Sequence, residues 1–166
     1  KAQIHQFLRL PDELLISESF KHMSGKDIWS LCNSSKEFKV RCKALLPILK
    51  RSRKPSDRAT YKRINLYQKK IVLSQLKSEL NLPTDRDWEP AYMLHTAIFR
   101  GNIKAVKKIL EITDDKSTID VPHAFFLHKT PIDEALKQIF WASKTTVHVH
   151  VEILKLLLQS GLRRIS

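Results

Sequence analysis

The sequence contains few glycines and cysteines and no long apolar run. Only 3 of the 166 residues are glycine, which leaves little material for hairpin turns or for the glycine-rich loops that cradle phosphates. The common nucleotide-binding, zinc-protease and serine-hydrolase motifs are absent from the sequence. No apolar run approaches the roughly 18 residues that a membrane helix needs. We therefore expect neither an enzyme nor a membrane-spanning protein, and we expect no cofactor.

The two cysteines, Cys32 and Cys42, lie ten residues apart without a second pair. Disulfide frameworks and zinc sites normally use four ligands at closer spacing, so we expect two free thiols in a reducing compartment. His148 and His150 lie in a segment, 145–151, that alternates like a strand. Because no third ligand lies nearby in the sequence, we interpret them as a surface pair and expect no metal site.

Positive charge is in clear excess. The chain has 30 Lys and Arg residues against 17 Asp and Glu, a formal net charge of +13. The densest stretch is 47–70, with nine basic side chains against one acidic side chain, Asp57. Such a cluster can bind polyanions or, at 50–55, serve as a nuclear-import signal. Pro47 and Pro55 are expected to interrupt any helix, so we predict that 47–64 is a basic linker between two packed units.

The first part of the chain is predicted to form three short helices. Pro11, followed by two acidic residues, is typical of a helix start, Ser24 is expected to cap a second helix, and a third is expected over 35–46. The apolar residues expected to face inward are Ile16, Phe20, Met23, Ile28, Leu31, Cys32, Phe38, Cys42, Leu45 and Leu46. Three such helices cannot enclose a large core, so we expect apolar surface to remain for a partner.

Three motifs in this region, in order, resemble an F-box. They are LPDELL at 10–15, SGKDIWSLC at 24–32 and SSKEF at 34–38. The family's apolar pair would fall at Glu18 and Ser19, whereas the large residue here is Phe20, which a one-residue insertion in the first helix would explain. The resemblance covers about residues 8–46. It implies docking on a Skp-family adaptor of a cullin-RING ubiquitin ligase through Leu10, Pro11, Leu14, Leu15, Ile28, Leu31 and Phe38.

Residues 65–82 are predicted to form an amphipathic connecting helix. Asn65 can cap it, and four leucines recur along one side: Leu66, Leu73, Leu76 and Leu80. Leucines at this spacing are typical of a core-facing stripe. We therefore expect this helix to pack against and cap the C-terminal half of the chain.

The segment 88–166 contains a loose internal repeat that resembles ankyrin repeats. YMLHTA at 92–97 is followed by Gly101 and Asn102, and TPIDEA at 130–135 is followed by an apolar stretch at 153–161. The resemblance implies that His95 makes a turn-stabilising hydrogen bond. Because such arrays need about three repeats, we expect capping by 65–82 or further repeats beyond Ser166.

The ankyrin resemblance also nominates a binding surface for a target protein. The family's ligand-facing positions map onto Trp88, Glu89, Ala91, Phe99, Arg100, Phe126, Leu127, Lys129, Lys137 and Gln138. Aromatic and Arg side chains are enriched in interface hot spots, and the basic members would favour an acidic partner. Alternatively, Phe126 and Leu127 only pack the long loop that contains them.

The favoured interpretation is an all-α adaptor with two modules and no catalytic residues, which brings a target protein to the ligase by proximity. An F-box before ankyrin-like repeats is similar to effectors that intracellular pathogens deliver into eukaryotic cells, and the alternative is an ordinary eukaryotic or viral F-box protein. We expect the protein in the cytoplasm or nucleus of a eukaryotic cell, the host cell if it is an effector. The alternatives are a basic, helical nucleic-acid-binding protein, which the few aromatics in 47–70 disfavour, and an ankyrin-type scaffold without ligase association.

Overall fold

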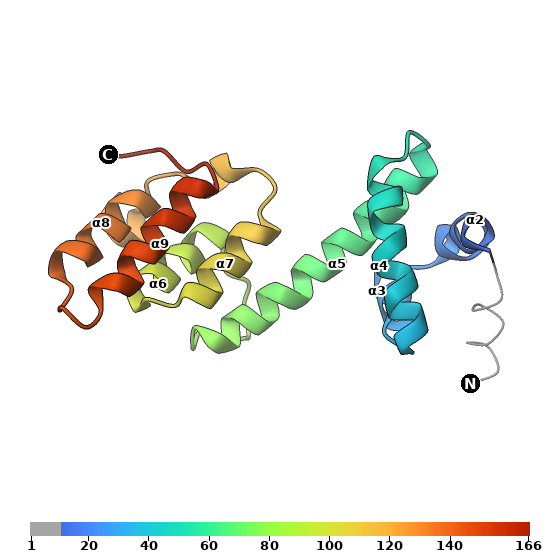
Figure 1. The fold of residues 1–166 in the computed structure, drawn as a ribbon, viewed down its shortest axis with the longest axis horizontal. Helices are drawn as coiled ribbons and strands as arrows, with labels where there is room; N and C mark the ends of the chain where they lie inside the picture. The colour runs from blue at the N-terminus through green and yellow to red at the C-terminus, as the bar shows by residue number, and fades with distance from the viewer. Residues whose placement is uncertain (1–10) are drawn as a thin grey trace. The chain divides into compact units, whose positions relative to one another are not determined.

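The computed structural model describes residues 11–166, and these residues form helices without a β-strand, so the predicted all-α class is confirmed. The chain divides into two compact units, Lys1–Ile71 (unit 1) and Val72–Ser166 (unit 2). The division falls inside helix α5, Pro55–Glu79 (Figure 1). The division thus follows residue 71, whereas the sequence predicts a linker between the two units at 47–64. Leu10, the first of the expected docking residues, lies outside the described residues.

From Asp12 onward, unit 1 contains three short helical segments, α2 (Asp12–Leu14), the π-helical turn η1 (Leu15–Ser19) and the 3₁₀ turn η2 (Phe20–His22). Helices α3 (Gly25–Cys32) and α4 (Lys36–Arg51) come next in the chain. The Ser24 hydroxyl accepts the Asp27 backbone N–H at 3.1 Å, and Ser35 accepts that of Phe38 at 3.1 Å. Both serines satisfy N–H groups that a helix start leaves without an intrahelical partner, so the predicted starts of these two helices are confirmed.

The π-helical turn sets the register of the first helical segment. In a π turn the backbone bonds join residues five apart, and the Phe20 N–H reaches the Leu15 carbonyl. Leu15 and Phe20 therefore share a face, and both are fully buried. A π turn holds one residue more than an α turn, which is the local change that a one-residue insertion would produce.

The core of unit 1 is small. Within residues 11–71 it consists of eight buried side chains: Leu15, Phe20, Ile28, Phe38, Cys42, Leu45, Leu49 and Ile64. The start of α3 lies so close to α5 that a Cβ atom at Gly25 would come within 2.4 Å of the Arg63 carbonyl oxygen. The Arg63 guanidinium donates to the Phe20 carbonyl at 3.0 Å. Backbone proximity and this long-range hydrogen bond thus supplement a limited apolar core.

The predicted linker at 47–64 is wrong, because most of it is helical. Pro47 lies inside α4, where the burial of Leu45 and Leu49 on either side holds the helix across the lost hydrogen bond. Pro55 opens α5 at the one position where a helix readily accepts proline. Asn65, expected to cap a helix, lies inside α5.

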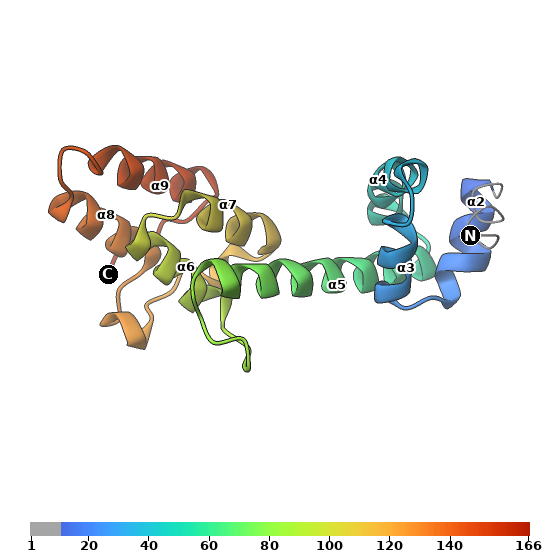
Figure 2. The ribbon, with the colours of Figure 1, turned by 90° about the horizontal axis from the view of Figure 1, so that it is seen from below.

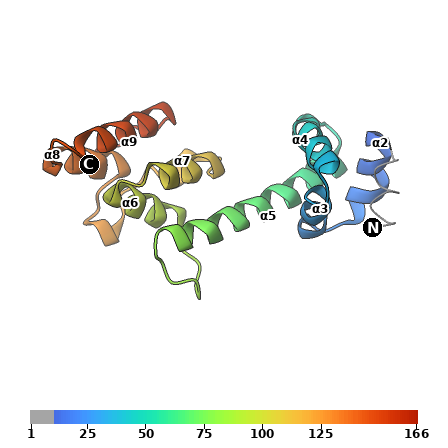
Figure 3. The same ribbon diagram turned by 60° about the horizontal axis from the view of Figure 1, so that its bottom comes forward.

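Unit 2 consists of two helical hairpins. Helix α6 (Pro90–Arg100) packs against α7 (Ile103–Ile112), and α8 (Pro131–Trp141) packs against α9 (Val147–Gln159). Contacts of α6 with α8 and of α7 with α9 join the hairpins into two layers (Figure 2, Figure 3). Seventeen residues form the core, including Leu76 of α5 and Leu80 directly after it. Leu73 packs against this core, whereas Leu66 is 58% exposed, so only the C-terminal part of the predicted leucine stripe packs against the hairpins.

Local signals account for most of these helix ends. Gly101 ends α6 with φ +68°, and the Asn102 side chain caps α7 by accepting the Ala105 N–H at 3.0 Å. Thr130 and Asp133 form a reciprocal capping box at the start of α8. Burial acts to raise the pKa of the Asp133 carboxyl, but hydrogen bonds from Ser166 and Thr130 outweigh it and lower the pKa to about 2.

The predicted strand at 145–151 is wrong. Residues from Val147 onward form α9, although three of the first five are valine. Ile153 and Leu157, four residues apart, are fully buried on one face of this helix. Burial at helical spacing therefore overrides the β propensity of the valines. His148 is exposed and His150 half-buried.

Candidate functional sites: two interaction surfaces

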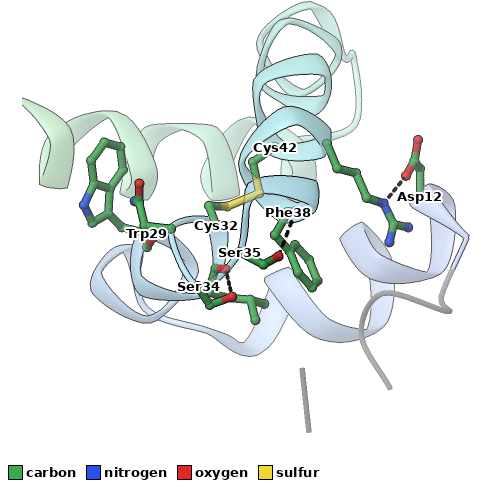
Figure 4. Close-up of a disulfide and its surroundings, with 10 residues drawn as sticks. Asp12, Trp29, Cys32, Ser34, Ser35, Phe38 and Cys42 are labelled. Carbon is green, nitrogen blue, oxygen red and sulfur yellow. Dashed lines mark hydrogen bonds and ion pairs between the residues drawn. A yellow bond between two sulfur atoms is a disulfide. The ribbon is translucent and has the colours of Figure 1, made fainter. Parts of the chain in front are cut away.

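Cys32 and Cys42 form a disulfide that joins the end of α3 to the middle of α4 (Figure 4). Their Cα atoms are 5.8 Å apart, within the range that a disulfide spans. The prediction of two free thiols is wrong, because the α3–α4 hairpin turns both side chains toward each other. A spacing of ten residues does not reveal this without the hairpin.

An apolar pocket of about 200 Å³ lies beside this disulfide. Its apolar lining comes from η2, α3, α4 and α5 and consists of Phe20, Trp29, Cys32, Cys42, Leu45, Leu46, Leu49 and Ile64. The Trp29 ring meets Tyr67 edge to face at 6.4 Å, and Lys39 and Lys43 also line the pocket. A pocket of this kind can receive an apolar side chain from a partner.

The residues expected to dock an adaptor divide into buried and accessible groups. Leu15, Ile28 and Phe38 are fully buried in the core of unit 1, so in this structure they hold the unit together and present no surface. Pro11 is exposed, Leu14 is 45% exposed, and Leu31 is half-buried against the core. Two exposed apolar residues of α4 were missed: Val40 and Ile48 are 71% and 57% exposed.

In unit 2, a pocket of about 400 Å³ is lined by aromatic and charged side chains; we call it the aromatic pocket. Its lining consists of Arg86, Asp87, Trp88, Glu89, Tyr92, His123 and Phe125. Trp88 and Glu89 come from the loop before α6, Tyr92 from α6 itself, and the last two from the loop before α8. The structure therefore brings together two segments more than thirty residues apart in sequence.

Stacked rings organise the aromatic pocket. Trp88 stacks on Tyr92 with ring centroids 4.9 Å apart, and Tyr92 meets Phe125 edge to face at 5.4 Å. The Trp88 indole N–H donates to the Pro83 carbonyl at 2.8 Å, which fixes the ring in the loop. The Arg86 guanidinium carbon lies 4.1 Å from the centroid of the Trp88 ring, a cation–π contact.

Two carboxylates lie at this pocket. Asp87 pairs with Lys77 at 3.1 Å, and Glu89 lies 3.4 Å from the His123 ring. Both carboxylate side chains are largely exposed. The pocket is thus an aromatic surface with two accessible carboxylates, one of them paired with Lys77, and with the cation Arg86 in its lining.

Behind this pocket, His95 is buried and stacked on Phe126, with ring centroids 4.6 Å apart. Burial, together with the nearby His123, lowers the pKa of His95 to about 4, so its imidazole is neutral at neutral pH. A hydrogen bond with the Val121 backbone acts to raise this pKa and is outweighed by burial. The ring packs as an aromatic core residue, and the turn-stabilising role expected for His95 stays a prediction.

The structure does not gather the expected target-binding residues into one surface. Trp88 and Glu89 line the aromatic pocket, and half-buried Phe126 packs on Tyr92 and His95 beneath it. The remaining predicted positions lie outside the pocket lining: Ala91, Phe99, Arg100, Leu127, Lys129, Lys137 and Gln138. Ala91 is buried, and the Arg100 guanidinium donates to the Leu80 carbonyl at the end of α5.

Two groups of aromatic residues were missed by the sequence analysis. Tyr92, His123 and Phe125 line the aromatic pocket, and the only signal for them was their proximity in sequence to predicted positions. Phe140 and Trp141 at the end of α8 are 78% and 74% exposed, with their rings edge to face at 5.4 Å. Exposed aromatics on a helix end are a recognisable sign of an interaction surface.

Comparison with protein-family models, with curated proteins and with solved structures gave no match. Within residues 11–166, no three His, Cys, Asp or Glu side chains lie together as a metal site would require. None of the helices in that same part of the chain is long and apolar enough to span a membrane.

Proposed function

We propose that this chain is a non-catalytic recruitment adaptor. Unit 1 docks a Skp-family subunit of a cullin-RING ubiquitin ligase, and unit 2 holds a target protein for ubiquitination. Support comes first from the F-box-like motifs at 10–15, 24–32 and 34–38. The ankyrin-like motifs of 88–166 support the target-binding role of unit 2.

The observation that carries the proposal is the apolar surface that unit 1 leaves uncovered. Leu14, Val40 and Ile48 are each 45% to 71% exposed, and the same unit contains the apolar pocket beside the disulfide. Exposed apolar area of this kind is typical of a protein-binding face. The buried members of the predicted docking set act indirectly, by fixing α2, α3 and α4 on which the exposed members lie.

Co-purification with a Skp-type adaptor tests the proposal. The variant pair is Pro11→Ala/Leu14→Asp, which alters the accessible docking residues, and Leu66→Asp, a matched control at a residue of α5 that is 58% exposed. We expect wild type and the control to form a one-to-one complex and the double variant to lose it. A wild-type chain that is folded by circular dichroism and forms no complex would overturn the proposal.

A second candidate function, binding of nucleic acid by unit 1, is favoured by its charge. Residues 11–71 carry 15 Lys and Arg against 6 Asp and Glu, a formal charge of +9. Five exposed basic residues lie at the turn between α4 and α5: Lys50, Arg51, Arg53, Lys54 and Arg58. Phosphate contacts make affinity fall steeply with salt. Specific binding that survives physiological salt would favour this function, whereas binding lost below it reflects only general charge attraction.

A further inference from the structure

We propose that the aromatic pocket of unit 2 binds the guanidinium group of an arginine side chain presented by a target protein. The inference rests on the proposed function in one respect, which is that the arginine belongs to the target protein held by unit 2. The pocket itself can be tested without any ligase subunit. It also reverses the charge expected of the partner, since the sequence favoured an acidic one.

The rings provide the first argument. A guanidinium is attracted to the electron-rich face of an aromatic ring, and this attraction is stronger for Trp than for Tyr or Phe. Trp88 and Tyr92 stack, and Phe125 meets Tyr92 at 85°, which forms an aromatic corner. Phe125 is 77% exposed. A side chain so exposed contributes little to the core and is available to a ligand.

The intrinsic cation provides the second argument. The Arg86 guanidinium already lies over the Trp88 ring at 4.1 Å. The surface therefore accepts this chemical group in this geometry. Arg86 is exposed and belongs to the loop between α5 and α6, so it occupies the ring as an intramolecular competitor.

Charge provides the third argument. Two largely exposed carboxylates, Asp87 and Glu89, lie at the pocket in a chain whose net charge is +13. Asp87 is already paired with Lys77, so Glu89 is the carboxylate offered to a ligand. A planar guanidinium can donate two hydrogen bonds to one carboxylate while its face rests on a ring. An ammonium group lacks this combination, so the arrangement favours arginine over lysine.

The probe is a blocked hexapeptide with one arginine among glycine and serine, and the signal is the indole N–H resonance of Trp88. Blocking both ends removes the terminal charges, and a single arginine limits repulsion by the basic chain. Matched peptides carry lysine or the neutral isostere citrulline in place of arginine. We expect a saturable shift with the arginine peptide, a weaker one with lysine and none with citrulline.

Three variants of the full chain locate the site. Phe125→Ala and Glu89→Gln should each weaken binding about twofold to fivefold, as expected for one exposed cation–π contact or ion pair. Arg86→Ala should strengthen it about twofold to fivefold, because a competitor and a like charge are removed. The controls Phe140→Ala and Glu152→Gln change exposed residues of the same types elsewhere in unit 2 and should leave binding unchanged.

Several outcomes would overturn the inference. These are the absence of any Trp88 shift with the arginine peptide, equal binding of the citrulline peptide, tighter binding of the lysine peptide, or equal losses in the control variants. The Skp-complex assay uses unit 1 residues and a different readout. Failure of one test is therefore distinguishable from failure of the other.

Discussion

The two units of this chain solve the problem of stability in different ways. Over residues 11–71, unit 1 has eight buried apolar side chains, a disulfide and a formal charge of +9. Unit 2 has seventeen such side chains and a formal charge of +2, from 13 basic and 11 acidic residues. No disulfide lies in unit 2, which contains no cysteine.

This difference has a physical consequence. A small core contributes little free energy of folding, and small domains commonly add a covalent crosslink or a partner. The positive charge of unit 1 also lowers its folding stability through self-repulsion. We therefore expect the disulfide to contribute a larger share of stability in unit 1, whereas the larger core of unit 2 can support a pocket built on exposed rings.

Truncation of the largest core residues gives the greatest expected effect. Phe38→Ala in unit 1 should cost about 3–5 kcal/mol and Ile98→Ala in unit 2 about 2–5 kcal/mol, since both side chains are fully buried. We expect Phe38→Ala to unfold unit 1 at 25 °C. Ile98→Ala should lower the stability of unit 2 but leave it folded. The separate indole N–H signals of Trp29, Trp88 and Trp141 report this, and simultaneous loss of all three would contradict it.

Acid should affect unit 2 through His95. Its pKa is lowered from 6.5 to about 4 in the folded chain, so the unfolded state binds more protons between these values. Stability is fully present above pH 6.5 and falls as the pH drops toward 4, by at most about 3 kcal/mol. Urea titrations at pH 7 and pH 4.5 measure the loss. His95→Leu should reduce it, and exposed His148→Asn should not.

Reduction of the disulfide should affect unit 1 alone. Opening a crosslink between residues ten apart costs about 2–3 kcal/mol in a chain-entropy account. We expect dithiothreitol to lower the urea midpoint of the Trp29 signal and to leave that of Trp88 unchanged. The Cys32→Ser/Cys42→Ser variant should have the same urea midpoint as the reduced chain, and dithiothreitol should not change it. An equal response of both signals would contradict separate stabilities.

Local features of the fold could be predicted from the sequence. Ser24 and Ser35 are small hydrogen-bonding residues before apolar stripes, and both cap helices as such residues do. The helices of unit 2 begin and end near Thr130, Gly101 and Asn102 for the same kind of local reason. Such signals act within one turn and need no tertiary context.

Features that depend on tertiary packing could not be predicted in this way. Pro47 stays inside α4 and the valines of α9 stay helical because neighbouring residues are buried. Cys32 and Cys42 meet only once α3 and α4 pack. Of the aromatic pocket, Trp88 and Glu89 were predicted, but His123 and Phe125 join them through contacts between distant segments.

The π-helical turn at Leu15–Ser19 affects how positions can be transferred to or from this chain. Suppose this chain is aligned without gaps to a chain that has an α turn at this place. The residues before the turn and the residues after it then need alignments that differ by one position. Pro11 and Leu14 belong to the first numbering frame, and Phe20 and everything beyond it to the second. Positions transferred from a chain that has an α turn here would therefore shift by one residue between Leu15 and Phe20.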